Sequence, residues 1–212
     1  LAETADVFVM DAFGTAHRKQ ASTYGVTEFV KEAYVGLLVE EELMALKKII
    51  DSPEKPLLGI IGGSKISTKM KILKSLTNHV DQLIIGGALA NTCFKALGKN
   101  IGKSLYEEAY VDLAKTIIED KKILLPSYVV VTKGRDSNSQ EKHIDEVEDD
   151  DIIFDIGQSA IEDFSQYINS AKTIIWNGPM GYFEEERFAK GTAGIALKIS
   201  ESSGYSLSLI HI

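Results

Sequence analysis

Short apolar runs alternate with longer amphipathic segments along most of the chain. We predict strands where three to five mostly apolar residues run together, and helices where apolar residues recur every three or four positions. The predicted strands cover residues 7–10, 57–61, 82–85, 123–125, 129–131, 151–154 and 173–176. The predicted helices cover residues 37–50, 65–76, 89–97, 105–119, 160–168 and 188–200. Strands alternating with helices in this way imply βαβ units and a parallel sheet.

The order of these elements predicts an α/β fold. We expect a Rossmann-like parallel sheet with helices on both faces, preceded by a remnant of a second α/β lobe. The boundary is placed at the helix over residues 37–50, which carries three acids in its early turns and ends before Pro53. Residues 28–34 have a mixed pattern, and the polar, acidic residues 133–151 are expected to form a surface excursion.

Composition narrows the classes of partner. The 212 residues are 44% hydrophobic and 25% charged, as in a globular protein, and the net charge of −8 argues against nucleic acid. No apolar stretch reaches the roughly 18 residues of a membrane helix, and the start lacks a signal-peptide pattern. The single Cys93 cannot form an internal disulfide, so a reducing, cytoplasmic location without a membrane partner is expected.

The strongest chemical signal is Gly62-Gly63-Ser64-Lys65, which follows a predicted strand and opens a helix. The glycines let a ligand approach the backbone, and the free N–H groups of a helix start favour an anion. Lys65 and Lys69 lie four residues apart, where like charges repel by about 0.2–0.5 kcal/mol, and both oppose the helix dipole. A polyphosphate between them would reverse these penalties. The alternative is a pair of solvated lysines on an amphipathic helix.

A second candidate loop follows the first predicted strand and presents Asp11, His17 and Arg18. The planar guanidinium of Arg18 suits a carboxylate or phosphate, and His17 could supply another donor. In the alternative interpretation the loop is structural, and Asp11 is an acceptor that caps it.

A third candidate loop follows the last predicted strand and contains Asn177, Pro179 and Glu184. The Glu184 carboxylate could accept hydrogen bonds from two ribose hydroxyls, and Asn177 could donate or accept. Alternatively, Glu184 and the two acids after it cap the next helix. The pair Gly86-Gly87 closes another strand and would leave room for a flat ligand, although such pairs are common in α/β turns.

Several familiar catalytic motifs are missing. Residues 98–104 resemble a phosphate-binding P-loop but have three residues between their glycines instead of four, so we predict a turn between helices. The four histidines have no ligand spacing, and no metal site is predicted. Neither a nucleophile elbow nor a dinucleotide fingerprint is present.

Taken in order, these segments resemble signatures of the phosphoglycerate kinase family in its bacterial form. The resembling segments are residues 6–18, 62–69, 82–94 and 174–184. The resemblance implies a bilobal enzyme of glycolysis that transfers a phosphoryl group from 1,3-bisphosphoglycerate to ADP, giving 3-phosphoglycerate and ATP. In that family the N-terminal lobe binds 3-phosphoglycerate, the C-terminal lobe binds the magnesium nucleotide, and a long helix joins them.

The resemblance also implies roles for individual residues. Arg18 matches a ligand of the substrate phosphate, with His17 beside it in the same basic patch. Lys65 matches the lysine that steadies the transferring phosphoryl group, so Lys65 and Arg18 would be the catalytic residues. Lys69 matches a ligand of the nucleotide phosphates. The other nucleotide-binding positions implied are Gly63, Ser64, Gly87, Asn177, Pro179 and, at the ribose, Glu184.

The same resemblance predicts the division of the chain. We expect a remnant of the 3-phosphoglycerate lobe over residues 1–36, an interlobe helix over 37–52, an incomplete nucleotide lobe over 53–206 and a foreign tail over 207–212. The family's magnesium-binding aspartate, in a Gly-Gly-Gly-Asp-Thr loop, has no counterpart here. Mg²⁺ would therefore be carried with ADP or ATP. We expect a monomeric fragment that turns over little or nothing alone.

Three other functions stay open at this point: a nucleotide-binding module without catalysis, a dinucleotide oxidoreductase and a purely structural α/β domain. Titration with ADP and with NAD separates the first two. Charge reversal at Lys65 and Lys69 without a change in ADP affinity would favour the third.

Overall fold

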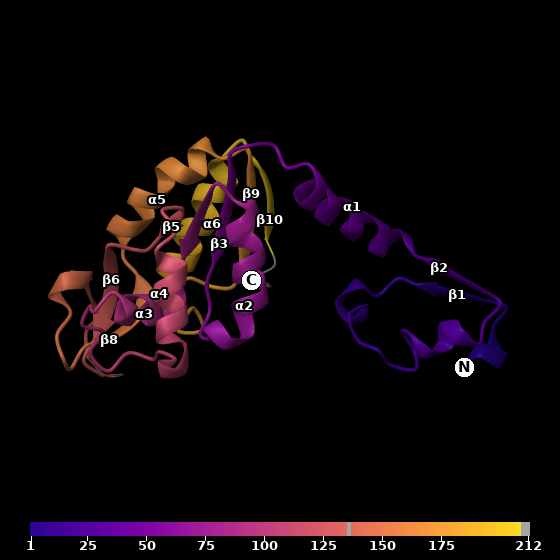
Figure 1. The fold of residues 1–212 in the computed structure, drawn as a ribbon, viewed down its shortest axis with the longest axis horizontal. Helices are drawn as coiled ribbons and strands as arrows, with labels where there is room; N and C mark the ends of the chain where they lie inside the picture. The colour runs from indigo at the N-terminus through magenta and orange to yellow at the C-terminus, as the bar shows by residue number, and fades with distance from the viewer. Residues whose placement is uncertain (135–136, 209–212) are drawn as a thin grey trace. The chain divides into compact units, whose positions relative to one another are not determined.

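The computed structural model describes residues 1–134 and 137–208, apart from the side chains of Ile66, Thr68, Met70 and Lys71. The chain divides into two compact units, Leu1–Pro53 and Glu54–Ile212 (Figure 1). In the described residues, no helix combines the length and the apolar character that crossing a membrane requires.

The first unit is built on a two-stranded parallel sheet. Strand β1 (Val7–Met10) pairs with β2 (Glu32–Val35), and α1 (Leu37–Asp51) follows after Gly36. Short 3-10 turns lie at Ala2–Thr4, Phe13–Thr15 and Gly25–Glu28. The sequence pattern predicts no strand at β2. All four of its residues are exposed, so its sequence carries neither an apolar run nor the alternation of a half-buried strand.

Asp11 caps the first turn of α1. Its Oδ1 accepts a hydrogen bond from the Val39 amide at 3.0 Å, which satisfies one of the free donors at the helix start. Gly36 makes this approach possible, because a Cβ there would lie 2.2 Å from the Asp11 Cγ. Asp11 is thus a structural acceptor, as the alternative interpretation predicts, but it caps α1 and not its own loop.

The second unit contains a five-stranded parallel sheet in the order β10-β9-β3-β4-β5. Its strands are β3 (Leu57–Ile61), β4 (Gln82–Ile85), β5 (Ile123–Leu124), β9 (Thr173–Asn177) and β10 (Tyr205–Ser208). Central β3 is buried along its whole length, and Ile60 lies opposite Ile84 on one side and Trp176 on the other. Such a continuous apolar run is typical of a parallel strand covered on both faces.

Helices cover both faces of this sheet (Figure 1). They are α2 (Ile66–His79), α3 (Gly87–Ala96), α4 (Val111–Ile118), α5 (Gln158–Ser170) and α6 (Lys190–Glu201). Helices α5 and α6 pack together over a core that includes Leu58, Ile60 and Trp176, whereas α2 contacts β3 and β4. Further 3-10 turns lie at Glu108–Tyr110, Ile144–Glu146 and Glu186–Phe188. The predicted α/β class, with a parallel sheet between helices, is confirmed.

A separate three-stranded antiparallel sheet accompanies the parallel one. Strand β6 (Tyr128–Thr132) pairs with β7 (Gln140–His143) on one side and with β8 (Ile152–Ile156) on the other. Only residues 125–127 separate β5 from β6, too few for the crossover that a parallel neighbour requires. Strand β7 lies inside the predicted surface excursion, where two of its four residues are exposed, so no apolar pattern reveals it.

The P-loop-like segment is a turn, as predicted. It follows α3, and Gly98 and Gly102 have positive φ angles of 75° and 53°. The Lys103 amide donates to the carbonyl of Asp151 at 2.7 Å, which ties the turn to the segment before β8.

The first two residues of the predicted foreign tail continue a strand. Leu207 and Ser208 pair with Ile175 and Trp176 at the end of β10. Residues 209–212 lie outside the described part of the chain, so the foreign origin of this tail stays a prediction.

Candidate functional site

Strand β3 lies where the strand order of the parallel sheet reverses. From β3 the chain moves to β4 and β5 on one side, and it later adds β9 and β10 on the other. In open α/β sheets, ligands bind beyond the carboxyl ends of the strands at such a reversal. The loops after β3, β4 and β9 therefore meet where a ligand site is expected.

Backbone hydrogen bonds join these three loops to one another. The amides of Gly62, Gly87 and Leu89 donate to the carbonyls of Asn177, Met180 and Gly63, at 2.9, 2.8 and 3.0 Å. Because each bond connects a different pair of segments, the loops form one cradle instead of three independent turns.

The contact between the β3 and β9 loops depends on glycine. A Cβ at Gly62 would lie 2.0 Å from the carbonyl oxygen of Pro179, and one at Gly178 would lie 2.3 Å from the carbonyl oxygen of Gly62. Gly178 also has a φ of 86°, which other residues rarely adopt. The two loops therefore touch backbone to backbone.

Two buried side chains hold the loop after β9 in place. The indole Nε1 of Trp176 donates to the carbonyl of Gly178 at 2.8 Å, and Thr192 Oγ1 on α6 accepts from the Met180 amide at 3.0 Å. Trp176 and Thr192 are both buried. This loop of the cradle is thus anchored in the core.

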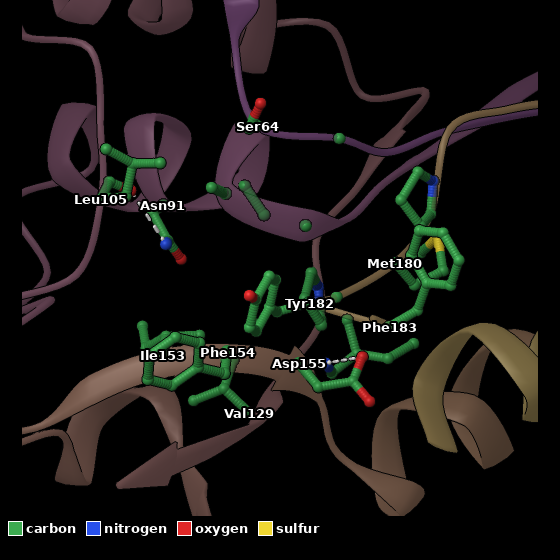
Figure 2. A pocket seen from close by; sticks show the side chains of 18 of the residues that line it. Ser64, Asn91, Leu105, Val129, Ile153, Phe154, Asp155, Met180, Tyr182 and Phe183 are labelled. Carbon is green, nitrogen blue, oxygen red and sulfur yellow. Dashed lines mark hydrogen bonds between the residues drawn. The ribbon is translucent and has the colours of Figure 1, made fainter. Parts of the chain in front are cut away.

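A cavity of about 450 Å³ lies beside the cradle (Figure 2). This volume falls within the range usual for small-molecule sites. One part of its wall is the glycine loops, and another is apolar. The apolar lining includes Ala90, Phe94, Leu105, Val129, Ile153, Phe154 and Phe183. Its charged and amide groups belong to Lys69, Asn91, Asp155 and Glu184.

Lys69 brings a positive charge to the cavity. Its ammonium group donates a hydrogen bond to Oδ1 of Asn177, at the end of β9. Partial burial lowers the pKa of Lys69, because desolvation disfavours the charged form. An anion in the cavity would counter this effect by stabilising the ammonium form.

Lys65 occupies the N-cap position of α2, which begins one residue later than predicted. The side chain is exposed, and Lys65 is not among the residues lining the cavity. Of the predicted apolar stripe on α2, Leu73 is buried and Leu76 is half-buried, whereas the side chains of Ile66 and Met70 lie outside the described part. Whether both lysines flank one anion stays a prediction.

Asp155, at β8, is a cavity residue that the sequence pattern does not single out. Its carboxyl group is buried and accepts hydrogen bonds from the amides of Ile156 at 2.9 Å and Gly191 at 2.6 Å. Burial raises the pKa of Asp155 to about 7. A Cβ at Gly181 would lie 2.2 Å from its Oδ1, so the carboxyl group supports the β9 loop against α6.

Asn91, on α3, is a second cavity residue absent from the predicted set. It is 1% exposed, and its Nδ2 donates to the carbonyl of Leu105 at 3.0 Å. A sequence signal does exist, since Asn91 is polar among the apolar residues of the predicted helix over 89–97. Buried polar side chains of this kind normally have a specific partner.

The structure gathers most of the predicted nucleotide-binding residues at one place. Those that line the cavity are Gly63, Ser64, Lys69, Gly87, Pro179 and Glu184. Asn177 reaches it through its hydrogen bond with Lys69. Arg18 and His17 belong to the first unit, where both are exposed and the Arg18 Nε lies 3.5 Å from the His17 Nε2.

The cluster of acidic side chains with metal-ligand spacing lies away from the cavity. Within residues 1–134 and 137–208, the group with metal-ligand spacing is Glu148, Asp150 and Asp151, and none of the three lines the cavity. Lys133 and Lys142 form ion pairs with these acids at 2.7–3.1 Å. This acidic group therefore does not belong to the cavity, whose own carboxylates are Asp155 and Glu184.

Comparison with known proteins gives a consistent result. A family model described as phosphoglycerate kinase matches residues 1–210. A phosphoglycerate kinase of Vibrio campbellii is 46% identical over 209 residues, which cover 98% of this chain and 54% of that protein. The chain thus spans about half the length of the curated relative it matches.

Solved structures agree with the sequence comparison. Phosphoglycerate kinase from Coxiella burnetii matches with a TM-score of 0.90 and 43% identity, over 98% of this chain and 55% of that one. The enzyme from Pyrococcus horikoshii OT3 matches with a TM-score of 0.86 and 27% identity, over 98% and 54%.

Proposed function

The chain belongs to the phosphoglycerate kinase family, and from this membership we propose that it forms roughly the middle half of an enzyme of glycolysis, including most of the nucleotide-binding lobe. The proposed reaction transfers a phosphoryl group from 1,3-bisphosphoglycerate to ADP, giving 3-phosphoglycerate and ATP, and runs in both directions. One observation carries the proposal: glycine loops from β3, β4 and β9 meet Lys69 at a single cavity where the strand order reverses.

The proposed ADP lies along the cavity with its phosphates at the glycine loops. The backbone of Gly63 and Ser64, just before α2, offers the environment of a helix start, which favours anions. Lys69 neutralises part of the phosphate charge, and Glu184 accepts hydrogen bonds from the ribose hydroxyls. The apolar part of the lining leaves room for the flat base.

Phosphoryl transfer asks a protein mainly for positioning and charge neutralisation. In the proposed enzyme Lys65 steadies the transferring group, and Arg18, with His17 beside it, binds the substrate phosphate. Mg²⁺ is proposed to arrive with the nucleotide, where it neutralises charge on the phosphate oxygens. No step is assigned to a protein-held metal.

Calorimetric titration of this chain with ADP tests the nucleotide half of the proposal. We expect saturable binding that weakens at least about tenfold in Lys69→Met, because a charge-assisted contact is lost. Lys74→Met, an exposed lysine farther along α2, is the matched control and is expected to bind as the wild type does. Binding of NAD in place of ADP, or equal affinity in both lysine variants, would contradict the proposal.

A coupled assay with ATP and 3-phosphoglycerate tests the catalytic half. Because the chain spans about half the length of its relatives, we expect little or no turnover from it alone. A rate near that of a full-length relative would show that this chain carries a complete active site. We further propose that the protein is cytoplasmic and monomeric, which fractionation and sedimentation would test.

A further inference from the structure

The side chain of Asn91 is buried at the wall of the cavity with one of its polar atoms unpaired. Its Nδ2 donates to the carbonyl of Leu105 at 3.0 Å. Its Oδ1 is also buried, and it has no hydrogen-bond partner in the part of the chain that the structure describes. A buried acceptor left unpaired is costly, and a donor on a ligand in the cavity would offset that cost.

The Leu105 carbonyl sets the orientation of the Asn91 amide. If the amide were turned over, Oδ1 would face the carbonyl oxygen of Leu105, and two acceptors would oppose each other. Leu105 precedes the 3-10 turn at Glu108–Tyr110 and is not part of a helix, although the sequence pattern predicts one there. Nδ2 therefore stays on the Leu105 carbonyl, and Oδ1 is the atom left for a ligand.

The surroundings of this acceptor are apolar. Figure 2 shows the Asn91 side chain directed into the pocket, with Val129, Ile153 and Phe154 across from it. An aromatic ring held between such walls can satisfy Oδ1 only through a donor on its edge. A hydrogen bond formed there is well shielded from water. A ligand whose ring edge offers a donor to Oδ1 should therefore bind more tightly than one whose edge offers an acceptor.

We propose that Asn91 reads the base of the bound nucleotide. Its Oδ1 accepts a hydrogen bond from the exocyclic amino group of a 6-aminopurine and opposes the carbonyl oxygen of a 6-oxopurine. The inference rests on the nucleotide site proposed above and adds a specificity-determining residue to it. Asn91 contacts the base and takes no part in phosphoryl transfer.

Three diphosphates that differ only at position 6 of the purine test the proposal: ADP, inosine diphosphate and purine riboside diphosphate. With the wild-type chain we expect ADP to bind about 3- to 10-fold more tightly than inosine diphosphate, as one neutral hydrogen bond allows. Purine riboside diphosphate, which has neither amino group nor carbonyl there, should lie between the two. Equal wild-type affinities for ADP and inosine diphosphate would overturn the proposal without any variant.

Asn91→Leu removes the acceptor while keeping a side chain of similar size. We expect the preference for ADP to fall to within about twofold, through weaker ADP binding and not through a general loss of affinity. Cys93→Ala, a buried position on the same helix that does not line the cavity, is the matched control and should keep the wild-type ratio. An unchanged ratio in Asn91→Leu would overturn the inference.

The two proposals fail in different ways. If the wild-type chain binds none of the three diphosphates, the nucleotide site itself is wrong. If all three bind and depend on Lys69, but with equal affinity, the site stands and the role of Asn91 is wrong.

Discussion

The ammonium group of Lys69, on α2, donates a hydrogen bond to the side-chain oxygen of Asn177, at the end of β9. The amide is uncharged, so it holds the lysine in place without neutralising it. A phosphate would pair with the same ammonium group more strongly, because both partners are then charged. Asn177 thus positions the lysine for an anion that can partly displace it.

Lys69→Arg should change how ADP binding depends on pH. Desolvation lowers the pKa of Lys69, so the wild type loses its cationic form, and with it ADP affinity, at a lower alkaline pH than an exposed lysine would. A guanidinium stays charged throughout this range. We expect affinity measured calorimetrically to fall with rising alkaline pH in the wild type and in Lys74→Arg, and to stay level in Lys69→Arg. Parallel curves in all three would contradict this.

Gly62→Ala should destabilise the protein and disturb the glycine loops beside the cavity together. The new Cβ would lie 2.0 Å from the Pro179 carbonyl oxygen, a contact that only backbone movement can relieve. We expect a loss of at least about 2 kcal/mol in the free energy of unfolding in urea, with weaker ADP binding.

Gly134→Ala is the control for this substitution. At that position the nearest atom to a new Cβ is Ser137 Oγ at 3.8 Å, an ordinary contact. We expect a change of about 0.5 kcal/mol or less. Equal effects in the two variants would show that the contact between the β3 and β9 loops does not limit stability.

Asp155→Asn should remove a part of the pH dependence of stability. Burial raises the pKa of Asp155 from 3.8 to about 7, so the folded state keeps this proton where the unfolded chain releases it. The contribution of this proton to the free energy of unfolding is fully present below about pH 4 and is lost as pH rises through about 7. Between pH 5.5 and 8 the free energy of unfolding of the wild type should fall by about 2 kcal/mol more than that of the variant.

Urea unfolding at both pH values measures this difference. Asp163→Asn, at an exposed position of α5, controls for the loss of an acid and should follow the wild type. If the free energies of unfolding of the wild type and Asp155→Asn differ by the same amount at both pH values, the carboxyl group does not titrate as described.

Glu184→Ala should weaken binding only when the ribose hydroxyls are present. We expect about a tenfold loss of affinity for ADP, because hydrogen bonds to a carboxylate are lost, and less than about a twofold loss for 2′,3′-dideoxy-ADP. Glu186→Ala, which removes an exposed acid outside the cavity lining, should leave both affinities unchanged. A similar loss for the two nucleotides would place Glu184 away from the ribose.

The sequence predicts the elements whose burial is uniform. Strands β3 and β4 are almost fully buried, so each appears as a mostly apolar run, and the glycines after them mark the loops beside the cavity. Strands β2 and β7 carry exposed residues, so no pattern distinguishes them from loops. The antiparallel pairing of β6 with β7 follows from the short connection over residues 133–139, which is too short for the crossover of a parallel pair.

The site residues divide in the same way. Lys69 and Glu184 could be predicted because each lies close to a strand end that carries glycines. Asn91 is marked only by its polar character in an apolar helix, and Asp155 is not marked at all. Their contacts depend on partners far along the chain: the Leu105 carbonyl, 14 residues away, and the Gly191 amide, 36 residues away. Only the folded structure brings these groups together.

The indole of Trp176 has a practical use that follows from its hydrogen bond to Gly178. It is the single tryptophan of the chain, so all indole fluorescence comes from one point under the loop that holds Pro179. Emission excited at the red edge of protein absorbance therefore reports on this loop beside the cavity and not on an average over the protein. A ligand that moves this loop would change the emission, and its entry could then be timed by stopped-flow mixing without any added dye.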